Sequence, residues 1–245
     1  KILLKQSSST VKKVSMELGG HAPFIVFDDA NIDEAVTGAI TSKFRNSGQT
    51  CICANRLFVH EKVYDEFLEK FVAEVAKIKV GNGLESSTSS GPLIDQFSLE
   101  KVQDHVNDAV NTGAKIAIGG DIHSLGGNFY KPTVLSNVTT KAKITYEETF
   151  GPVAPIYKFS SDEEVINLAN DTPFGLASYF FARDIGRIWK VAEALEYGIV
   201  SVNTGLPTKA EIPFGGVKES GLGREGSRYG LDDYLEIKYI SMAGI

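Results

Sequence analysis

Apolar residues follow two patterns along the chain. Residues 23–27 form a short continuous apolar run, which is typical of a strand buried on both faces. In residues 63–79, large apolar side chains recur at every fourth position, which predicts a helix with one buried face. Asn31 precedes the segment 32–44 and is followed three residues later by Glu34, so this pair resembles a helix capping box.

Strand-like and helix-like segments alternate along most of the chain. The predicted strands are 11–17, 23–27, 56–59, 115–118, 153–159, 177–181, 199–202 and 235–240. The predicted helices are 32–44, 63–79, 99–112, 162–168 and 185–195. Pro155 favours an edge or irregular position for the strand that contains it. Strands separated by helices imply crossover connections, so we expect an α/β fold with a mainly parallel, three-layer sheet.

Length and charge narrow the possible partners. With 245 residues, 42% hydrophobic and 23% charged, the chain fits one large globular domain, with or without an appendage. A net charge of -6 argues against binding to nucleic acid, which requires a basic surface. Because charged residues interrupt every apolar stretch, we also expect no membrane partner.

The cysteine content and the N-terminus indicate the cellular setting. Cys51 and Cys53 are the only two cysteines, which is too few for a disulfide scaffold and favours a reducing compartment. Residues 1–7 lack the apolar core of a secretory signal, and the chain does not begin with Met, which suggests a fragment. We therefore expect a cytoplasmic protein, or a mitochondrial matrix protein in a eukaryote. Two cysteines near a single histidine, His60, are too few ligands for zinc, so no metal site is expected.

Cys51 is the first candidate for chemistry. It follows a Gly-Gln-Thr turn and precedes Ala54-Asn55-Arg56, which could open a helix. At a helix N-terminus, exposed N–H groups would favour the thiolate and face a developing oxyanion. An isolated cysteine is more often a small buried apolar residue, and spacing alone favours that interpretation.

Glu17 is the second candidate. It lies between apolar residues and Gly19-Gly20 at the end of the predicted strand 11–17, where open α/β sheets place ligands. Desolvation there would raise the carboxyl pKa towards that of a general base. A solvated strand-end glutamate is the more common alternative. The Gly-x-Gly-x-x-Gly pattern at 221–226 is not a dinucleotide fingerprint, because no buried strand leads into it.

Four segments, in order along the chain, resemble the aldehyde dehydrogenase superfamily. They are Met16-Glu17-Leu18-Gly19-Gly20, Gly48-Gln49-Thr50-Cys51, Glu147-Glu148-Thr149-Phe150-Gly151-Pro152, and Pro213-Phe214-Gly215-Gly216 followed by Lys218 and Ser220-Gly221. The resemblance implies a remnant of the cofactor-binding domain in 1–17, a catalytic domain in 18–221, and a C-terminal tail with an oligomerisation strand in 222–245. It also favours the functional interpretation of Cys51 and Glu17.

The resemblance implies a role for each matching residue. Cys51 attacks an aldehyde, NAD or NADP accepts hydride, and Glu17 activates the water that hydrolyses the thioester. For the cofactor, it implies that Glu148 binds the nicotinamide ribose, that Phe150 packs beside the nicotinamide, and that two more contacts come from Leu18 and Gly19. Phe214 matches an aromatic wall of the substrate pocket.

Within the superfamily, residues 44–53 are similar to succinate-semialdehyde dehydrogenases of GABA degradation. That similarity implies that Arg45 binds the distal carboxylate of the substrate, because a guanidinium can donate two parallel hydrogen bonds to a carboxylate. It also implies that Cys53 is a redox partner of Cys51. Thr208 occupies the region of a substrate-binding Ser, but Pro207 and Lys209 alter this loop. Glutarate semialdehyde or a longer ω-oxo acid is therefore an alternative substrate.

The family resemblance also implies that a first half is absent. That half supplies most cofactor contacts and one oxyanion donor, a group worth ~10²–10³ in rate. We therefore expect low activity from this chain alone, and a homodimer or homotetramer for the full-length enzyme. Two other classes stay open, a cysteine hydrolase that uses His60 and a catalytically inert assembly fragment.

Overall fold

A seven-stranded sheet forms the centre of the computed structural model, which describes residues 1–244. Its strands are β2 (Ala22–Val26), β3 (Ala54–His60), β4 (Lys115–Ile118), β5 (Thr133–Ser136), β6 (Val153–Phe159), β8 (Ala177–Phe181) and β9 (Ile199–Val202). They lie in the order β4-β5-β6-β3-β2-β8-β9. Every neighbouring pair is parallel except β4 with β5, so the prediction of a mainly parallel sheet is confirmed.

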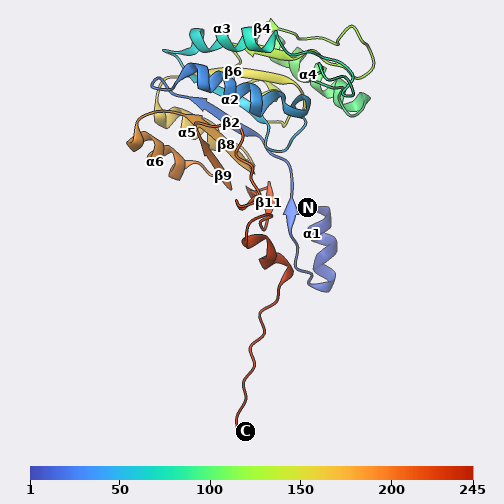
Figure 1. Cartoon of the computed structure of the whole chain (residues 1–245), viewed down its shortest axis with the longest axis vertical. Helices are drawn as coiled ribbons and strands as arrows, with labels where there is room; N and C mark the ends of the chain where they lie inside the picture. The colour runs from blue at the N-terminus through green and yellow to red at the C-terminus, as the bar shows by residue number, and fades with distance from the viewer. Residues whose placement is uncertain (245) are drawn as a thin grey trace.

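Helices cover both faces of this sheet (Figure 1). The helices α2 (Ile32–Phe44) and α3 (Tyr64–Val75) share one hydrophobic core with Phe24 and Val26 of β2. The other face is covered by α4 (Gln96–Asn111), α5 (Asp162–Asn170) and α6 (Ile185–Ala194), which share a second core with Ile25 and Phe27. Alternate residues of β2 thus enter opposite cores, as a strand buried on both faces requires.

The predicted strand 153–159 exists as β6, but the prediction of an edge position is wrong. β6 lies between β5 and β3. Residues 153–155 pair with β5, whereas residues 156–159 pair with β3. Pro155 therefore sits where the pairing changes from one neighbour to the other, which is how an interior strand accommodates a residue without an N–H.

Small elements extend from the sheet on the side of the N-terminus (Figure 1). They include α1 (Ile2–Ser7) and two short antiparallel ladders, β1 (Met16–Glu17) with β11 (Gly221–Leu222) and β7 (Phe174–Gly175) with β10 (Val217–Lys218). The predicted strand 11–17 is therefore largely wrong. Residues 8–10 form a 3-10 turn, and Val11 adopts the left-handed region with φ 51°.

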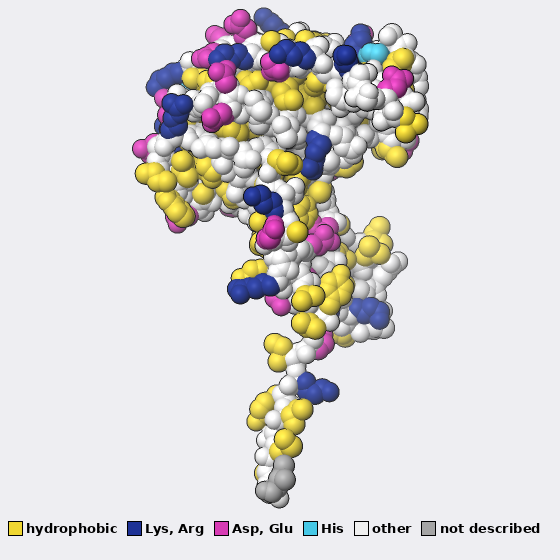
Figure 2. All heavy atoms as spheres, in the orientation of Figure 1, with side chains coloured by type: hydrophobic (Ala, Val, Ile, Leu, Met, Phe, Trp, Pro, Cys, Tyr) yellow, Lys and Arg dark blue, Asp and Glu magenta, His cyan; other side chains and the backbone are white. Residues whose placement is uncertain are grey.

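The C-terminal segment 235–244 runs away from the rest of the chain (Figures 1 and 2). The predicted strand 235–240 is not formed within residues 1–244, because its backbone pairs with no other strand there. The Leu235 carbonyl accepts from Lys13 Nζ at 3.2 Å. Leu235, Ile237 and Tyr239 are exposed on this segment. The role of this segment in oligomerisation stays a prediction. The domain boundaries expected at 17/18 and 221/222 also stay predictions, and the β1–β11 ladder places these two positions side by side. None of the helices in residues 1–244 is long and apolar enough to cross a membrane.

Arg56 is buried at the centre of β3 without a carboxylate partner among the described residues. Its guanidinium donates to the carbonyl oxygens of His21, Leu168 and Ala169 at 2.8–3.1 Å, and to the Tyr197 hydroxyl at 3.0 Å. Leu168 and Ala169 end α5, where the helix dipole favours a cation. Arg56 therefore joins the segment before β2, the end of α5 and the segment before β9.

We expect Arg56→Met to reduce the free energy of unfolding by about 3 kcal/mol or more, because several buried carbonyl groups lose their donor. Arg56→Lys should recover only part of this loss, since lysine lacks the planar fork. The measurement is urea unfolding, with the exposed Arg183 changed to Met as the control. An Arg56→Met midpoint equal to that of Arg183→Met would contradict this account.

Candidate active site

The three segments that carry Glu17, Cys51 and Glu148 lie at one edge of the sheet, because each directly precedes one of its strands. Residues 17–20 lead into β2, residues 50–53 into β3, and residues 147–151 into β6. These strands are neighbours and parallel, so their amino ends lie at the same edge. The expectation that Glu17 marks a carboxyl-end site is therefore wrong. The candidate site lies at the amino ends of the strands.

Cys51 lies in a tight turn that begins β3. The preceding 3-10 segment, Arg45–Gly48, contains Asn46 and Ser47 in the left-handed region with φ 51° and 57°. The Cys53 N–H donates to the Thr50 carbonyl at 3.0 Å and closes the turn. The prediction of a helix at Ala54 is wrong, because Ala54 already pairs with Ala22 of β2. Helix N-terminal stabilisation of a thiolate is therefore absent at this position.

The surroundings of Cys51 favour the thiol over the thiolate. Burial raises the pKa of Cys51 most, and the negative charges of Glu148 and Glu17 raise it further. The backbone N–H groups of Cys51 and Ile52 oppose this shift. Donors that stabilise negative charge on the sulfur can also stabilise an alkoxide formed beside it. Cys51 thus has local oxyanion donors but needs a base to become nucleophilic.

Glu148 is held against the segment that carries Glu17. Its Oε1 accepts from the Gly20 N–H at 3.0 Å, and its carbonyl accepts from Lys101 Nζ at 2.5 Å. Burial raises the pKa of Glu148, opposed by the Gly20 N–H and the charges of Lys101 and Lys43. The carboxyl group is therefore fixed in position at the sheet edge.

Two exposed apolar side chains flank the segments that meet at this carboxylate: Phe150 follows Glu148 by two positions, and Leu18 precedes Gly19. Phe150 is 37% exposed and has a left-handed backbone with φ 54°, a strained conformation for a bulky residue. Leu18 is 41% exposed. At Gly19, an added Cβ would lie 3.0 Å from Glu148 Oε2, so glycine keeps this face of the carboxylate accessible.

Glu17 occupies a shielded position on the β1–β11 ladder, where it pairs with Gly221. Both carboxyl oxygens are buried and have no hydrogen-bond partner within residues 1–244. Burial raises the pKa of Glu17 from 4.5 to about 7, with a further increase from the charge of Glu225 and opposition from Arg224. A carboxyl group that titrates near neutrality can act as a general base.

The Glu17 segment is fixed by residues far along the chain. Leu18 N–H donates to the Ser220 carbonyl at 3.0 Å, and the Ser220 hydroxyl donates to the Gly19 carbonyl at 2.7 Å. An added Cβ at Gly20 would lie 2.2 Å from the Cys51 carbonyl oxygen. Glu17 and Cys51 are thus positioned by segments in direct backbone contact.

Arg45 is exposed at the end of α2. It lines a cavity of about 260 Å³ together with Phe44, Ile78 and Leu206. Thr208 is half-buried two residues beyond Leu206, but it does not line this cavity. Phe214 packs against the core that Cys51 also contacts. The structure thus places Arg45 beside Leu206, which belongs to the same loop as Thr208.

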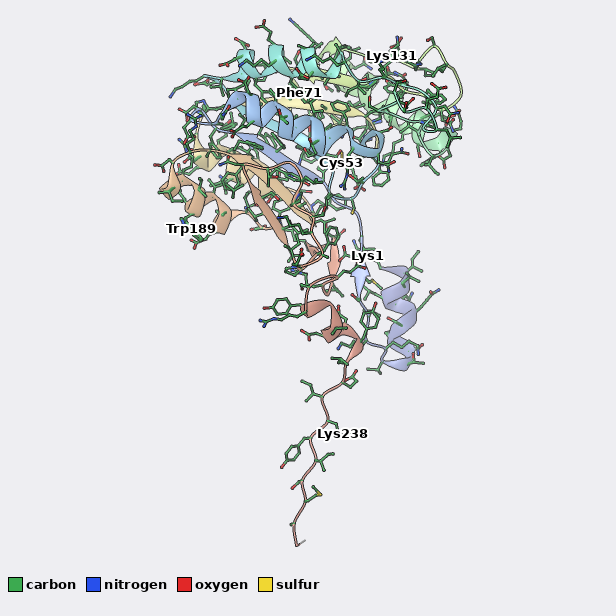
Figure 3. The ribbon with its side chains drawn as sticks, in the orientation of Figure 1. Lys1, Cys53, Phe71, Lys131, Trp189 and Lys238 are labelled. Carbon is green, nitrogen blue, oxygen red and sulfur yellow. The ribbon has the colours of Figure 1, made fainter. Side chains whose placement is uncertain are left out.

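Cys53 is fully buried and belongs to a polar cluster missed from the sequence. Lys43, also fully buried, donates from Nζ to Cys53 Sγ at 3.3 Å and to Asn55 Oδ1 at 3.0 Å. The available signal was spacing, because Lys43 follows the buried Ala35 and Ala39 at intervals of four. Figure 3 shows Cys53 on the side of the sheet that faces Lys1. Both cysteines are free thiols, and the redox partnership stays a prediction.

The sequence profile described as "Aldehyde dehydrogenase family" matches residues 1–240. The chain belongs to the aldehyde dehydrogenase family. The family resemblance noted from four short motifs is therefore confirmed over nearly the whole chain. In the part of the chain that the structure describes, no group of three or more His, Cys, Asp or Glu residues is arranged to hold a metal ion.

Several named members of the family are similar to this chain. It is 57% identical to a 3-sulfolactaldehyde dehydrogenase from Pseudomonas putida, covering 100% of this chain and 50% of the relative. A glutarate-semialdehyde dehydrogenase from Pseudomonas putida is 58% identical, covering 98% of this chain and 50% of the relative. The NADP(+) succinate-semialdehyde dehydrogenase of Escherichia coli is 56% identical, with coverages of 97% and 49%.

A solved structure confirms the fold. The succinate-semialdehyde dehydrogenase of Burkholderia pseudomallei has a TM-score of 0.97 and 58% identity, covering 98% of this chain and 50% of that chain. This aldehyde dehydrogenase chain spans about half the length of the curated relatives it matches. The family and the NADP(+) relative indicate use of a nicotinamide cofactor.

We expect Gly20→Ala to displace the segment that carries Glu17, because the new Cβ would overlap the Cys51 carbonyl. Overpacking of this kind costs about 1–3 kcal/mol of unfolding free energy. Gly83→Ala is the matched control, since nothing lies within 4 Å of its added Cβ. Chemical unfolding and the rate of Cys51 alkylation measure the effect. Equal behaviour of the two variants would show that the close approach does not exist.

The raised pKa of Glu17 predicts a pH-dependent stability difference. Protonated Glu17 is favoured in the folded chain, so its contribution is present below about pH 4.5 and is lost as pH rises towards about 7. Compared with Glu17→Gln, the wild-type chain should lose stability across this window. A carbon NMR titration should place the Glu17 midpoint near 7. A midpoint near 4.5 would contradict the shielded geometry.

Proposed function

We propose that this chain supplies the catalytic residues for NAD(P)-dependent oxidation of an aldehyde that carries a distal carboxylate, with succinate semialdehyde oxidised to succinate. The observation that carries this proposal is the arrangement around Cys51. The negative charges of Glu17 and Glu148 raise the pKa of its thiol. These two carboxylates belong to segments that lie beside the Cys51 segment at one edge of the sheet. One carboxylate acts as a base, and the other binds the cofactor.

The first half of the reaction forms a covalent bond to Cys51. Glu17, with a pKa of about 7, accepts the thiol proton, directly or through water, and the sulfur attacks the aldehyde carbon. The carbonyl π-bond breaks, and its electron pair becomes an alkoxide that the N–H groups of Cys51 and Ile52 stabilise. A nicotinamide held beside Glu148 would accept the hydride that the carbon bound to Cys51 gives up, which leaves a thioester on Cys51.

The second half releases the acid and restores the thiol. Glu17 first releases the thiol proton to solvent and then takes a proton from water as the water oxygen attacks the thioester carbon. The carbon–sulfur bond then breaks, its electron pair returns to sulfur, and the carboxylic acid leaves. A base with a pKa near neutrality suits both steps, because it can hold and release a proton at physiological pH.

The residues around Glu148 fit a nicotinamide nucleotide. The Glu148 carboxylate, accessible beside Gly19, can accept hydrogen bonds from ribose hydroxyls. Phe150 and Leu18 offer exposed apolar surface for the nicotinamide ring. These four residues are our proposed cofactor contacts from this chain, for either NAD or NADP.

Arg45 supports the choice of a carboxylate-bearing substrate. Its guanidinium has no ion-pair partner among residues 1–244 and lines a largely apolar cavity of about 260 Å³. A guanidinium at such a cavity suits a short carbon chain that ends in an anion. Thr208 and Phe214 complete the proposed substrate site. The names of the relatives support succinate semialdehyde, and glutarate semialdehyde is the alternative.

The test uses this chain fused to the other half of the Burkholderia pseudomallei relative, which supplies the length not spanned here. Formation of NADH or NADPH is followed with succinate semialdehyde, glutarate semialdehyde, 3-sulfolactaldehyde and uncharged aldehydes of equal length. We expect Cys51→Ser to abolish turnover. We expect Arg45→Met to raise KM for the carboxylate substrates about 10- to 100-fold, the value of a charged hydrogen bond, and to leave the uncharged aldehydes unchanged.

Arg183→Met, at an exposed position, is the control for general charge removal. Turnover that survives Cys51→Ser would overturn the proposed mechanism. An equal change in KM for charged and uncharged aldehydes would remove Arg45 from the substrate site but leave the mechanism standing. Aldehyde consumption without cofactor reduction would favour a hydrolase or another cysteine chemistry.

A further inference from the structure

His105 is a buried titratable residue that the proposed mechanism does not use. It lies on α4 and is completely inaccessible, on the same helix face as the apolar Val102, Val106 and Ala109. Its Nδ1 lies 3.2 Å from the Thr149 hydroxyl oxygen, and its Nε2 lies 3.2 Å from Glu147 Oε2. Glu147 and Thr149 are the two sequence neighbours of Glu148. One imidazole ring therefore contacts both sides of the proposed cofactor-binding carboxylate.

The chemistry of the two contacts fixes their direction. Burial lowers the pKa of His105 below its usual 6.5, helped by the charge of Lys101 and opposed by the hydrogen bond and charge of Glu147 and by the charge of Asp104, so the ring is mainly neutral at pH 7. A carboxylate only accepts hydrogen bonds, so Nε2 carries the proton and donates to Glu147. Nδ1 is then the acceptor, and the Thr149 hydroxyl donates to it. Both ring nitrogens are satisfied, which offsets the cost of burying this polar ring.

The rest of the Glu148 loop packs tightly against the same helix. Lys101, one turn before His105, donates to the Glu148 carbonyl at 2.5 Å. An added Cβ at Gly151 would lie 2.4 Å from Val102 Cγ2, so the backbone runs directly over α4. Between these contacts, Phe150 keeps its left-handed backbone. Such a strained residue persists only where its surroundings hold it on both sides.

We propose that His105 is a positioning residue for Glu148: its two directed hydrogen bonds, to Glu147 and from Thr149, hold the loop so that the Glu148 carboxylate stays at Gly20 beside Cys51. An apolar side chain of similar size would fill the same space on α4. It would not fix the loop, because packing lacks the directionality of hydrogen bonds. The further step, that this positioning supports cofactor binding by Glu148, rests on the proposed function.

Variants can separate the two contacts. His105→Leu removes both, His105→Asn keeps a polar atom near the Nδ1 position, and His105→Gln keeps one near the Nε2 position. Thr149→Val removes the hydroxyl that donates to His105, and Thr149→Ser retains it. Asn107→Ala, exposed on the same helix, is the control. Since Thr149 variants leave His105 in place, they test the contact even if His105→Leu unfolds the chain.

The first readout is the pH midpoint of Cys51 alkylation in this chain, followed by peptide mass analysis. The charge of Glu148 raises the Cys51 pKa, so a displaced Glu148 lowers the midpoint. Glu148→Gln sets the size of the full effect. We expect His105→Leu and Thr149→Val to shift the midpoint in the same direction as Glu148→Gln. We expect Thr149→Ser and Asn107→Ala to stay at the wild-type value.

The second readout is amide hydrogen exchange of residues 147–150, which we expect to become about tenfold faster in His105→Leu and Thr149→Val, the scale of one lost hydrogen bond. The proposal is wrong if residues 147–150 exchange at the wild-type rate in these two variants. It is also wrong if both variants keep the wild-type alkylation midpoint while Glu148→Gln shifts it. Neither readout needs cofactor or turnover. Failure of the proposed dehydrogenase function is therefore distinguishable from failure of this inference.

Discussion

The parallel register of β6, β3 and β2 is the constraint on which the candidate site depends. These three strands are neighbours and run in the same direction, so the segments that enter them meet at one edge. That edge brings Glu148, Cys51 and Glu17 together, although the first and last of them are more than a hundred positions apart in sequence. Arg56 strengthens the arrangement, because its buried guanidinium donates to carbonyl groups from the segment before β2 and from the end of α5, and to the Tyr197 hydroxyl before β9. Strand order and direction therefore place the three candidate residues at one edge, and hydrogen bonds between the loops fix their positions there.

The charges at this edge suit the proposed function, which gives the two carboxylates different roles. Burial and both negative charges favour the thiol form of Cys51, so the nucleophile is not ionised in advance. Glu17 has no hydrogen-bond partner within the described residues, and its pKa of about 7 allows it to take up a proton. Glu148 accepts from the Gly20 N–H and lies nearer the cations Lys101 and Lys43, which oppose the effect of burial on its pKa. Different environments thus assign different roles to two residues of the same type.

Much of the fold was predictable from sequence, because it depends on local patterns. Short motifs marked Glu17, Cys51 and Glu148 as candidates, and the order of the strands brings these three to one edge. The buried run at 23–27 and the capped helix 32–44 follow directly from apolar periodicity. Two expectations were wrong because of tertiary pairing: the helix at Ala54, which pairs with β2, and the edge alternative for the strand that contains Pro155, which lies between two strands. The strand expected at 11–17 is largely absent because Val11 adopts a left-handed backbone, and the strand expected at 235–240 pairs with no other strand in the described residues. The polar cluster around Lys43 and the role of His105 were missed. A lysine or histidine on a helix looks like a surface residue until its burial and its partners are known.

The central claim is that the amino edge of the sheet makes Cys51 the nucleophile and Glu17 the base that releases the product. The most direct measurement is acid quenching of the fused enzyme during turnover of succinate semialdehyde, followed by mapping of the acyl group. The account predicts a succinyl thioester on Cys51 and a larger amount of it in Glu17→Gln, because hydrolysis needs the base. A succinyl group on Cys53, or product formation with no acylated Cys51 in either protein, would contradict the account.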